Sequence, residues 1–181
     1  DSITEVSGYP EYLQTLLGSN YVVGNFGVCG STVVRGIFSS YMDQHAFQEA
    51  KNFAPNLVVI MLGTNDASSD VYENIGVFEV DYKELINEFQ VIESKPEIWV
   101  ANPPPIFNNV FGPSNDNLVQ GIIPSIKRAA DELRLPIIDV YSALVNHPEY
   151  FFEDGVHPNL EGAKAIAIEV KNAITSINKL N

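Results

Sequence analysis

The sequence predicts an α/β fold in a single domain, with a mainly parallel sheet and helices on both of its faces. Short apolar runs rich in β-branched residues alternate with segments of helical period, which is the pattern of consecutive βαβ units. No internal repeat, low-complexity tract or linker interrupts this alternation. A length of 181 residues also fits one domain better than two. We therefore expect residues 1–181 to form one domain whose ligand binds beyond the carboxyl ends of the strands.

The clearest predicted strand covers residues 57–62, an unbroken apolar run bounded by turn residues. Such a run is typical of a strand that is buried on both faces of a sheet. Shorter β-rich runs predict further strands at residues 21–23, 98–101 and 136–140. Gly30, Asn65 and Asn102 follow three of these four strands, so we expect them to converge at one edge of the sheet.

Segments with the spacing of an amphipathic helix lie between the predicted strands. Leucines on one face predict the first helix, and Gly18 is its stop signal. The apolar stripe that ends at Phe89 predicts a longer helix in the middle of the chain. The predicted helices cover residues 9–17, 45–53, 80–92, 122–133 and 160–177.

The charge balance excludes several classes of partner. Ten Lys and Arg face twenty-three Asp and Glu, for a formal net charge of −13, which argues against a nucleic-acid partner and against charge-driven binding to anionic membranes. No apolar run approaches the roughly 18 to 20 residues that a membrane span requires, so no membrane insertion is expected. Cys29 is the only cysteine, which excludes an intrachain disulfide and a thiolate metal site.

His157 follows Asp154 by three residues in the segment Asp154-Gly155-Val156-His157-Pro158-Asn159. Side chains three apart can lie side by side in a turn, and an aspartate so placed can accept the imidazole Nδ1–H. The Nε2 atom is then available as a general base, as a serine hydrolase requires. An ordinary acidic turn before a helix has the same pattern. His45 and His147 lack this setting, and we expect both to lie on the surface or to pack against helices.

Two further positions have a functional and a structural interpretation. Asn65, in Gly63-Thr64-Asn65-Asp66, can donate its amide to an oxyanion without adding a titratable group, or it can simply form a turn. Gly30 can bring a backbone N–H close to a ligand, or it can permit a tight bend. We expect Asp66 to tie down the loop rather than to take part in chemistry.

Four segments together carry a family resemblance that none carries alone. They are Asp1-Ser2-Ile3-Thr4, Asn25-x-Gly27-x-x-Gly30, Gly63-Thr64-Asn65-Asp66 and Asp154-Gly155-Val156-His157-Pro158-Asn159. In this order they resemble the four sequence blocks of the SGNH (GDSL-type) hydrolases, over nearly the whole chain. The resemblance implies a flavodoxin-like three-layer α/β/α sandwich and ester hydrolysis through an acyl-enzyme, without a metal or an organic cofactor. The chain has no G-x-S-x-G elbow, which belongs to a different hydrolase fold.

The resemblance also implies a role for each matched residue. Ser2 corresponds to the nucleophile, His157 to the general base and Asp154 to the carboxylate that orients it. The N–H groups of Ser2 and Gly30 and the side chain of Asn65 correspond to the oxyanion hole. The family's nucleophile ends a central strand, yet only Asp1 precedes Ser2 here, so we expect the first strand of the sheet to lie before Asp1.

A looser likeness bears on the substrate. Residues 9–13, 25–28 and 61–66 are similar to bacterial carbohydrate and sialate O-acetylesterases. This likeness implies the removal of O-acetyl groups from carbohydrates, with a small-molecule or oligosaccharide ester as the substrate. The sequence does not determine the location, and a bacterial secreted or periplasmic one is favoured over a cytoplasmic one. We expect substrate contacts from Asn102, Phe107, Phe111 and Val156. For the aromatic residues of the loops we expect one of two roles: a wall that binds a sugar or an acyl group, or a set of hydrophobic anchors for the loops. These residues are Phe107, Phe111, Tyr150, Phe151 and Phe152.

Other functions remain open on the sequence. A lysophospholipase or thioesterase would act on longer acyl chains, and an arylesterase would accept many short-chain esters. A flavodoxin-like binding module is the non-enzyme alternative, because Gly24, Gly27 and Gly30 loosely resemble a phosphate-cradling turn. Their spacing is not the dinucleotide fingerprint, and no phosphate-binding lysine follows. The sequence does not indicate an oligomeric state.

Overall fold

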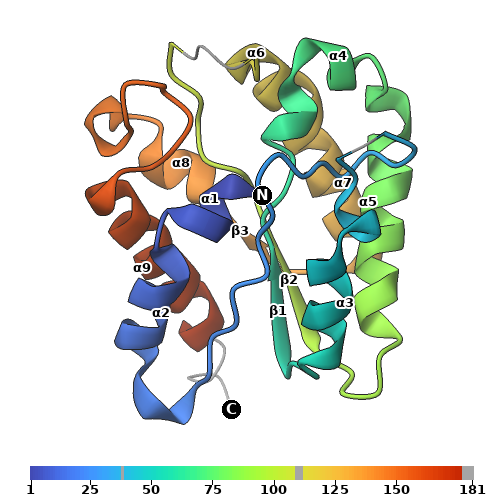
Figure 1. The fold of residues 1–181 in the computed structure, drawn as a ribbon, viewed down its shortest axis with the longest axis vertical. Coiled ribbons are helices and arrows are strands. Elements are labelled where there is room, and N and C mark those ends of the chain that lie inside the picture. The colour runs from blue at the N-terminus through green and yellow to red at the C-terminus, as the bar shows by residue number, and fades with distance from the viewer. Residues whose placement is uncertain (38, 109–111, 177–181) are drawn as a thin grey trace.

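The computed structural model of the chain describes residues 1–37, 39–108 and 112–176 (Figure 1). Within these ranges the sheet has three parallel strands in the order β1 (Leu57–Ile60), β2 (Glu97–Ala101) and β3 (Ile137–Ile138). Val59 lies opposite Trp99, and Val100 lies opposite Ile137. The predicted α/β class with a parallel sheet is confirmed.

Helices cover both faces of this sheet (Figure 1). On one face lie α2 (Tyr9–Leu17), α8 (Val140–Leu144) and α9 (Leu160–Ser176). On the other lie α3 (His45–Asn52), α5 (Ile75–Gln90) and α7 (Ile123–Leu133). The shorter helical segments are α1 (Ser2–Val6), η1 (Gly18–Asn20), η2 (Tyr41–Asp43), η3 (Asn65–Ala67), α4 (Ser69–Tyr72), α6 (Asn115–Asn117), the π-helical η4 (Leu118–Ile122) and η5 (Pro148–Tyr150).

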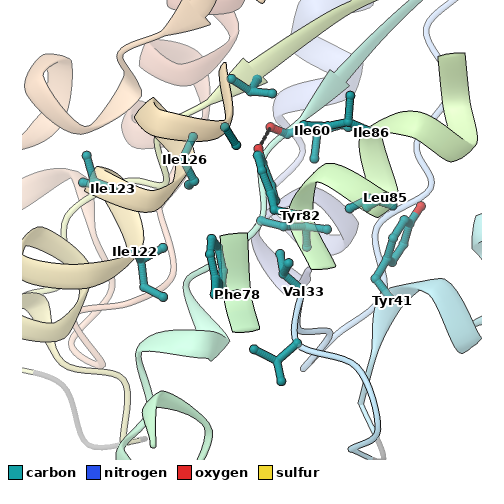
Figure 2. Packing of buried hydrophobic residues seen from close by; sticks show 14 of the residues in the cluster. Val33, Tyr41, Ile60, Phe78, Tyr82, Leu85, Ile86, Ile122, Ile123 and Ile126 are labelled. Atoms are coloured by element: carbon teal, nitrogen blue, oxygen red, sulfur yellow. Dashed lines mark hydrogen bonds between the residues drawn. The ribbon is translucent and has the colours of Figure 1, made fainter. Parts of the chain in front are cut away.

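The alternation of side chains along the strands divides the core into two clusters. Ile98 and Val100 of β2 point to the cluster under α3, α5 and α7, whereas Trp99 points to the cluster under α2, α8 and α9. Figure 2 shows the first cluster, in which the hydroxyl of the fully buried Tyr82 donates to the carbonyl of Ile60 over 3.4 Å. The sheet is thus buried on both faces, as its apolar strands predicted.

Some element boundaries differ from the sequence prediction. Residues 21–23 are extended but form no ladder among the described residues, and the predicted strand 136–140 shortens to Ile137–Ile138. It ends there because Asp139 caps α8, accepting from the N–H of Ser142. Helix α5 begins at Ile75, before the predicted residue 80, and Gly76 obscures the helical pattern of its first turn. Among the described residues, no helix has the length and apolarity needed to cross a membrane.

A groove of about 710 Å³ follows the outer edge of β1. One wall is β1 itself, and the other is formed by residues 20–24, which run from the end of η1 into the extended segment. Its lining includes Asp1 and apolar side chains from both core clusters, such as Leu13, Leu85 and Ile174. In the part of the chain that the structure describes, no strand pairs with this edge of β1. The strand expected before Asp1 stays a prediction, and this groove is where it would pair.

We predict that a strand-forming peptide added before Asp1 stabilises the fold. About six β-branched apolar residues span roughly 20 Å, enough to pair with β1 and to cover the groove. A gain of about 2 kcal/mol from this burial corresponds to a rise in Tm of about 4 to 8 °C. Thermal unfolding of the extended chain checks this, with a Gly/Ser extension of equal length as the control. Equal Tm values for the two extensions would contradict the prediction.

Candidate active site

Ser2, His157 and Asp154 form a hydrogen-bonded chain, although Ser2 and His157 lie 155 positions apart in the sequence. The Oγ atom of Ser2 lies 3.0 Å from Nε2 of His157, and Nδ1 of His157 lies 2.9 Å from Oδ2 of Asp154. With the carboxylate ionised, Nδ1 donates to Asp154 and Nε2 accepts from the serine hydroxyl. A hydroxyl, an imidazole and a carboxylate aligned in this way can act as nucleophile, base and orienting group.

The loop that carries Asp154 and His157 is shaped by the aspartate itself. Its Oδ1 atom accepts from the N–H groups of Val156 at 2.8 Å and His157 at 2.9 Å, which leaves Oδ2 to the imidazole. Gly155 has φ of 69°, and a Cβ atom there would lie 1.3 Å from the carbonyl oxygen of Phe107. A glycine is therefore required at this position for the loop to dock on Phe107, whose N–H donates to Gly155 over 2.7 Å.

The hydrogen bonds around Asp154 keep it an acceptor. Burial raises the pKa of this carboxyl, but the N–H groups of His157 and Val156 and the imidazole ring all donate to it. Together the donors outweigh burial and hold the pKa of Asp154 below its ordinary value. The carboxylate is thus ionised at neutral pH, as the orienting role requires.

Ser2 is the first residue of α1, a helix that the sequence pattern did not reveal. The helix has only five residues, three of them β-branched, so it carries little helical signal. The side chain of Asp1 caps it by accepting from the N–H of Ile3 at 2.9 Å. Ser2 is only 6% exposed, and its own N–H lies in the first turn, where helical N–H groups have no acceptor within the helix. An N–H in this position suits an oxyanion.

The two other predicted oxyanion residues lie on adjoining loops. Gly30, with φ of 76°, follows Cys29 in a turn in which Ser31 N–H donates to Val28 over 3.1 Å. The side-chain amide of Asn65, at the start of η3, donates to the carbonyl of Ser31 over 2.9 Å. The structure therefore places Asn65 directly beside the turn that carries Gly30.

The turn that carries Gly30 packs against α1. Cys29 N–H donates to the carboxylate of Glu5, and the Asn25 amide donates to the carbonyl of Thr4 over 2.9 Å. A Cβ atom on Gly27 would lie 2.4 Å from the nitrogen of Glu5. This close packing accounts for Gly27 without any phosphate ligand. No sequence signal pointed to Glu5, because its partner lies 24 positions away.

Asp66 ties the same loop to η3, as expected from its position after Asn65. Its carboxylate is 1% exposed and accepts from the N–H groups of Val33, at 2.9 and 3.0 Å, and Val34, at 2.9 Å. Burial raises its pKa to about 6, although these N–H donors oppose the shift. A buried carboxylate and the Asn65 amide thus hold residues 31–34 in place.

The residues predicted to contact substrate lie mostly in the interior. Val156 is 5% exposed, and Phe107 is half-buried with its ring edge-on to Phe151 at 5.1 Å. Asn102, 1% exposed, donates to the Asp139 carboxylate over 3.0 Å, so it joins β2 to the start of α8. Phe111 lies outside the described residues. Direct contact of these side chains with a substrate stays a prediction.

The remaining candidates for chemistry lie on the surface. His45 pairs with Glu49 at 3.4 Å and His147 with Glu149 at 2.9 Å, in line with the surface role expected of both histidines. Cys29 is a free, exposed thiol. In the described ranges, no group of three His, Cys, Asp or Glu side chains is placed to hold a metal ion.

A relative and two solved structures resemble this chain. An acetylxylan esterase of Xylanibacter ruminicola is 30% identical over 184 residues, which cover 92% of this chain and 38% of that protein. This chain therefore spans well under half the length of that relative. A carbohydrate acetylesterase family member of Sinorhizobium meliloti (21% identical; 93% of this chain, 85% of that one) has a TM-score of 0.72. An aryl esterase of M. smegmatis is 15% identical, and the match covers 97% of this chain and 86% of that one, also with a TM-score of 0.72. At these identities, the two structures establish the fold.

The raised pKa of Asp66 predicts a pH dependence of stability. The folded chain holds this proton up to about pH 6, whereas the unfolded chain releases it near 3.8, so the folded state binds more protons between these values. The contribution of Asp66 to stability is therefore greatest below pH 3.8 and declines as the pH rises to about 6. Denaturant unfolding at several pH values should show wild type losing stability relative to Asp66→Asn across this window. A constant difference between the two proteins would contradict the assignment.

A family match completes the evidence from the sequence blocks and the site. Residues 1–165 match the GDSL-like Lipase/Acylhydrolase family, a range that holds all four predicted blocks and every member of the hydrogen-bonded chain. The fold found in the esterase structures is the fold of this chain. The chain belongs to the GDSL-like lipase/acylhydrolase family.

Proposed function

We propose that this chain is a serine esterase that removes short acyl groups, chiefly acetyl, from carbohydrates through an acyl-enzyme on Ser2. The observation that carries the proposal is the alignment of Ser2 Oγ, the His157 ring and the Asp154 carboxylate at 3.0 and 2.9 Å. Membership of an acylhydrolase family supports the reaction class. The name of the relative, an acetylxylan esterase, supports an acetylated sugar as the substrate.

In the first half of the proposed reaction, His157 Nε2 takes the Ser2 hydroxyl proton as Oγ attacks the carbonyl carbon of the ester. Asp154 stabilises the imidazolium that forms and keeps its ring oriented. The negative charge that develops on the carbonyl oxygen meets the N–H groups of Ser2 and Gly30 and the Asn65 amide. A single preorganised donor of this kind lowers a barrier by about 2.7 to 4 kcal/mol.

The tetrahedral intermediate then collapses. The bond to the leaving oxygen breaks as His157 gives its proton to the departing alcohol, which leaves the acyl group on Ser2. A water molecule, deprotonated by His157, attacks the acyl-enzyme, and the serine regains its proton as the acid departs. Each proton is carried by the one imidazole, so the sequence of steps needs only the residues already aligned.

We predict that Ser2→Ala and His157→Ala each lower kcat by about 10⁴- to 10⁶-fold, because either change removes the nucleophile–base unit. Asp154→Asn should lower kcat by about 10³- to 10⁴-fold, since the amide favours the wrong tautomer of His157. Hydrolysis of 4-nitrophenyl acetate measures these losses. His147→Ala, a change at the exposed histidine paired with Glu149, is the control that keeps wild-type turnover. Retained activity in Ser2→Ala would overturn the nucleophile assignment.

The substrate range is tested with a panel of esters, using Ser2→Ala as the blank. We expect kcat/KM to be highest for acetyl esters of xylose, glucose or sialic acid and to fall from acetyl through butyryl to octanoyl esters of one alcohol. A rise with acyl chain length would favour the lysophospholipase or thioesterase alternative. Equal rates for acetylated sugars and simple aryl acetates would favour a broad arylesterase.

A further inference from the structure

A crevice of about 270 Å³ is lined in part by His157, a member of the hydrogen-bonded chain. Its walls are the end of α1 at Val6 and Ser7, the residue Phe152, and residues 157–160 at the start of α9. Because His157 belongs to both, the crevice adjoins the candidate active site. None of the roles assigned so far accounts for it.

The walls of this crevice are apolar and unusually exposed. Val6 is 67% exposed, Phe152 59% and Leu160 53%, and all three line this one small depression. Large apolar side chains that gather on a surface mark a binding site more often than scattered ones do.

The polar groups of the crevice are engaged elsewhere. Ser7 Oγ accepts from Tyr9 N–H over 3.3 Å. The Asn159 amide donates to the carbonyl of Glu149 over 2.8 Å, while its oxygen accepts from Glu161 N–H over 3.0 Å. What these walls offer to a ligand is therefore mainly apolar contact.

The position of the crevice suits the binding of the alcohol half of the ester. In the proposed reaction the leaving oxygen takes its proton from His157 Nε2, so the alcohol lies on the His157 side of the attacked carbonyl. Helix α1 rises about 1.5 Å per residue, which places Val6 only about 6 Å along the helix from Ser2. Phe152 is held next to His157, because its N–H donates to the His157 carbonyl over 2.9 Å. Both walls thus belong to the segments that carry Ser2 and His157.

The charges near the crevice are acidic. Glu5 lies on α1, Glu153 follows Phe152, and Glu161 follows Leu160. Glu161 pairs with Lys164 at 2.8 Å, and within the described residues no lysine or arginine pairs with the other two. With a formal net charge of −13 as well, the surroundings disfavour an alcohol that carries phosphate or carboxylate groups.

We propose that the crevice between Val6, Phe152 and Leu160 binds the leaving alcohol of the ester, and that this alcohol is an uncharged sugar whose apolar ring face lies on Phe152. The inference rests on the proposed function and deepens it, because it assigns a place to the sugar. A flat aromatic side chain beside apolar walls suits the carbon-bound hydrogens of a pyranose, while the sugar hydroxyls stay in water.

The test compares two acetyl esters that differ only in the leaving alcohol. An acetylated methyl xyloside fills the crevice, whereas the methanol of methyl acetate is too small to reach it. The quantity measured is the ratio of kcat/KM for the xyloside to kcat/KM for methyl acetate. We expect Phe152→Ala to lower this ratio about tenfold, mainly through KM, since about 1.4 kcal/mol of binding is tenfold. Phe152→Trp should restore it.

Controls separate the crevice from effects on folding. Phe53→Ala removes another exposed phenylalanine, 43% exposed at the end of α3, and should leave the ratio unchanged. If Phe152→Ala does not fold, Phe152→Leu keeps the apolar bulk while removing the aromatic face, and the same fall in the ratio is expected. An unchanged ratio, or an equal fall for both esters, would overturn the assignment of the crevice.

Failure of this inference can be told from failure of the proposed function. If neither ester is hydrolysed in a Ser2-dependent way, the esterase proposal itself fails. If Ser2-dependent hydrolysis of methyl acetate is measured and the ratio is the same in wild type and Phe152→Ala, only the sugar crevice is refuted.

Discussion

The hydrogen bond between Ser2 Oγ and His157 Nε2 is the constraint on which the rest of the site depends. It joins the first helix to the loop before the last one, so both must be held to within a fraction of an ångström. The cluster of side chains beneath α2, α8 and α9 provides that support, because it packs Ile3 of α1 together with Ile166 of α9 on one face of the sheet. The same packing that buries apolar surface therefore also aligns the Ser2 hydroxyl with the His157 imidazole.

Backbone geometry, rather than extra side chains, accounts for much of the precision of the site. Asp154 uses one oxygen to shape its own loop and the other to orient the imidazole. Gly155 allows that loop to lie against Phe107, and Gly27 allows the Gly30 turn to lie against α1. In each case a β-carbon would separate two backbones whose close approach sets the position of a functional group.

The buried carboxylate of Asp66 shows a second way of holding a loop. Burying a charge is unfavourable, and the raised pKa of Asp66 reflects that cost. In return its three short contacts fix the backbone of residues 33 and 34, while the neighbouring Asn65 amide fixes Ser31. Such rigidity suits the oxyanion-hole role proposed for this loop, because a preorganised donor does not have to reorganise during the reaction.

The sequence by itself determined the α/β class, the family and the residues of the hydrogen-bonded chain, because these depend on local periodicity and on short blocks with a fixed order. It also anticipated that Asp66 would tie down a loop. Only the tertiary structure decided that Asn65 adjoins the Gly30 turn, that Glu5 holds Cys29, and that Asn102 is buried and bonded to Asp139. It also decided which of the loop aromatics line the crevice at His157. The physical reason is that such contacts join residues tens of positions apart, and no local pattern records which distant segments a packed core will bring together.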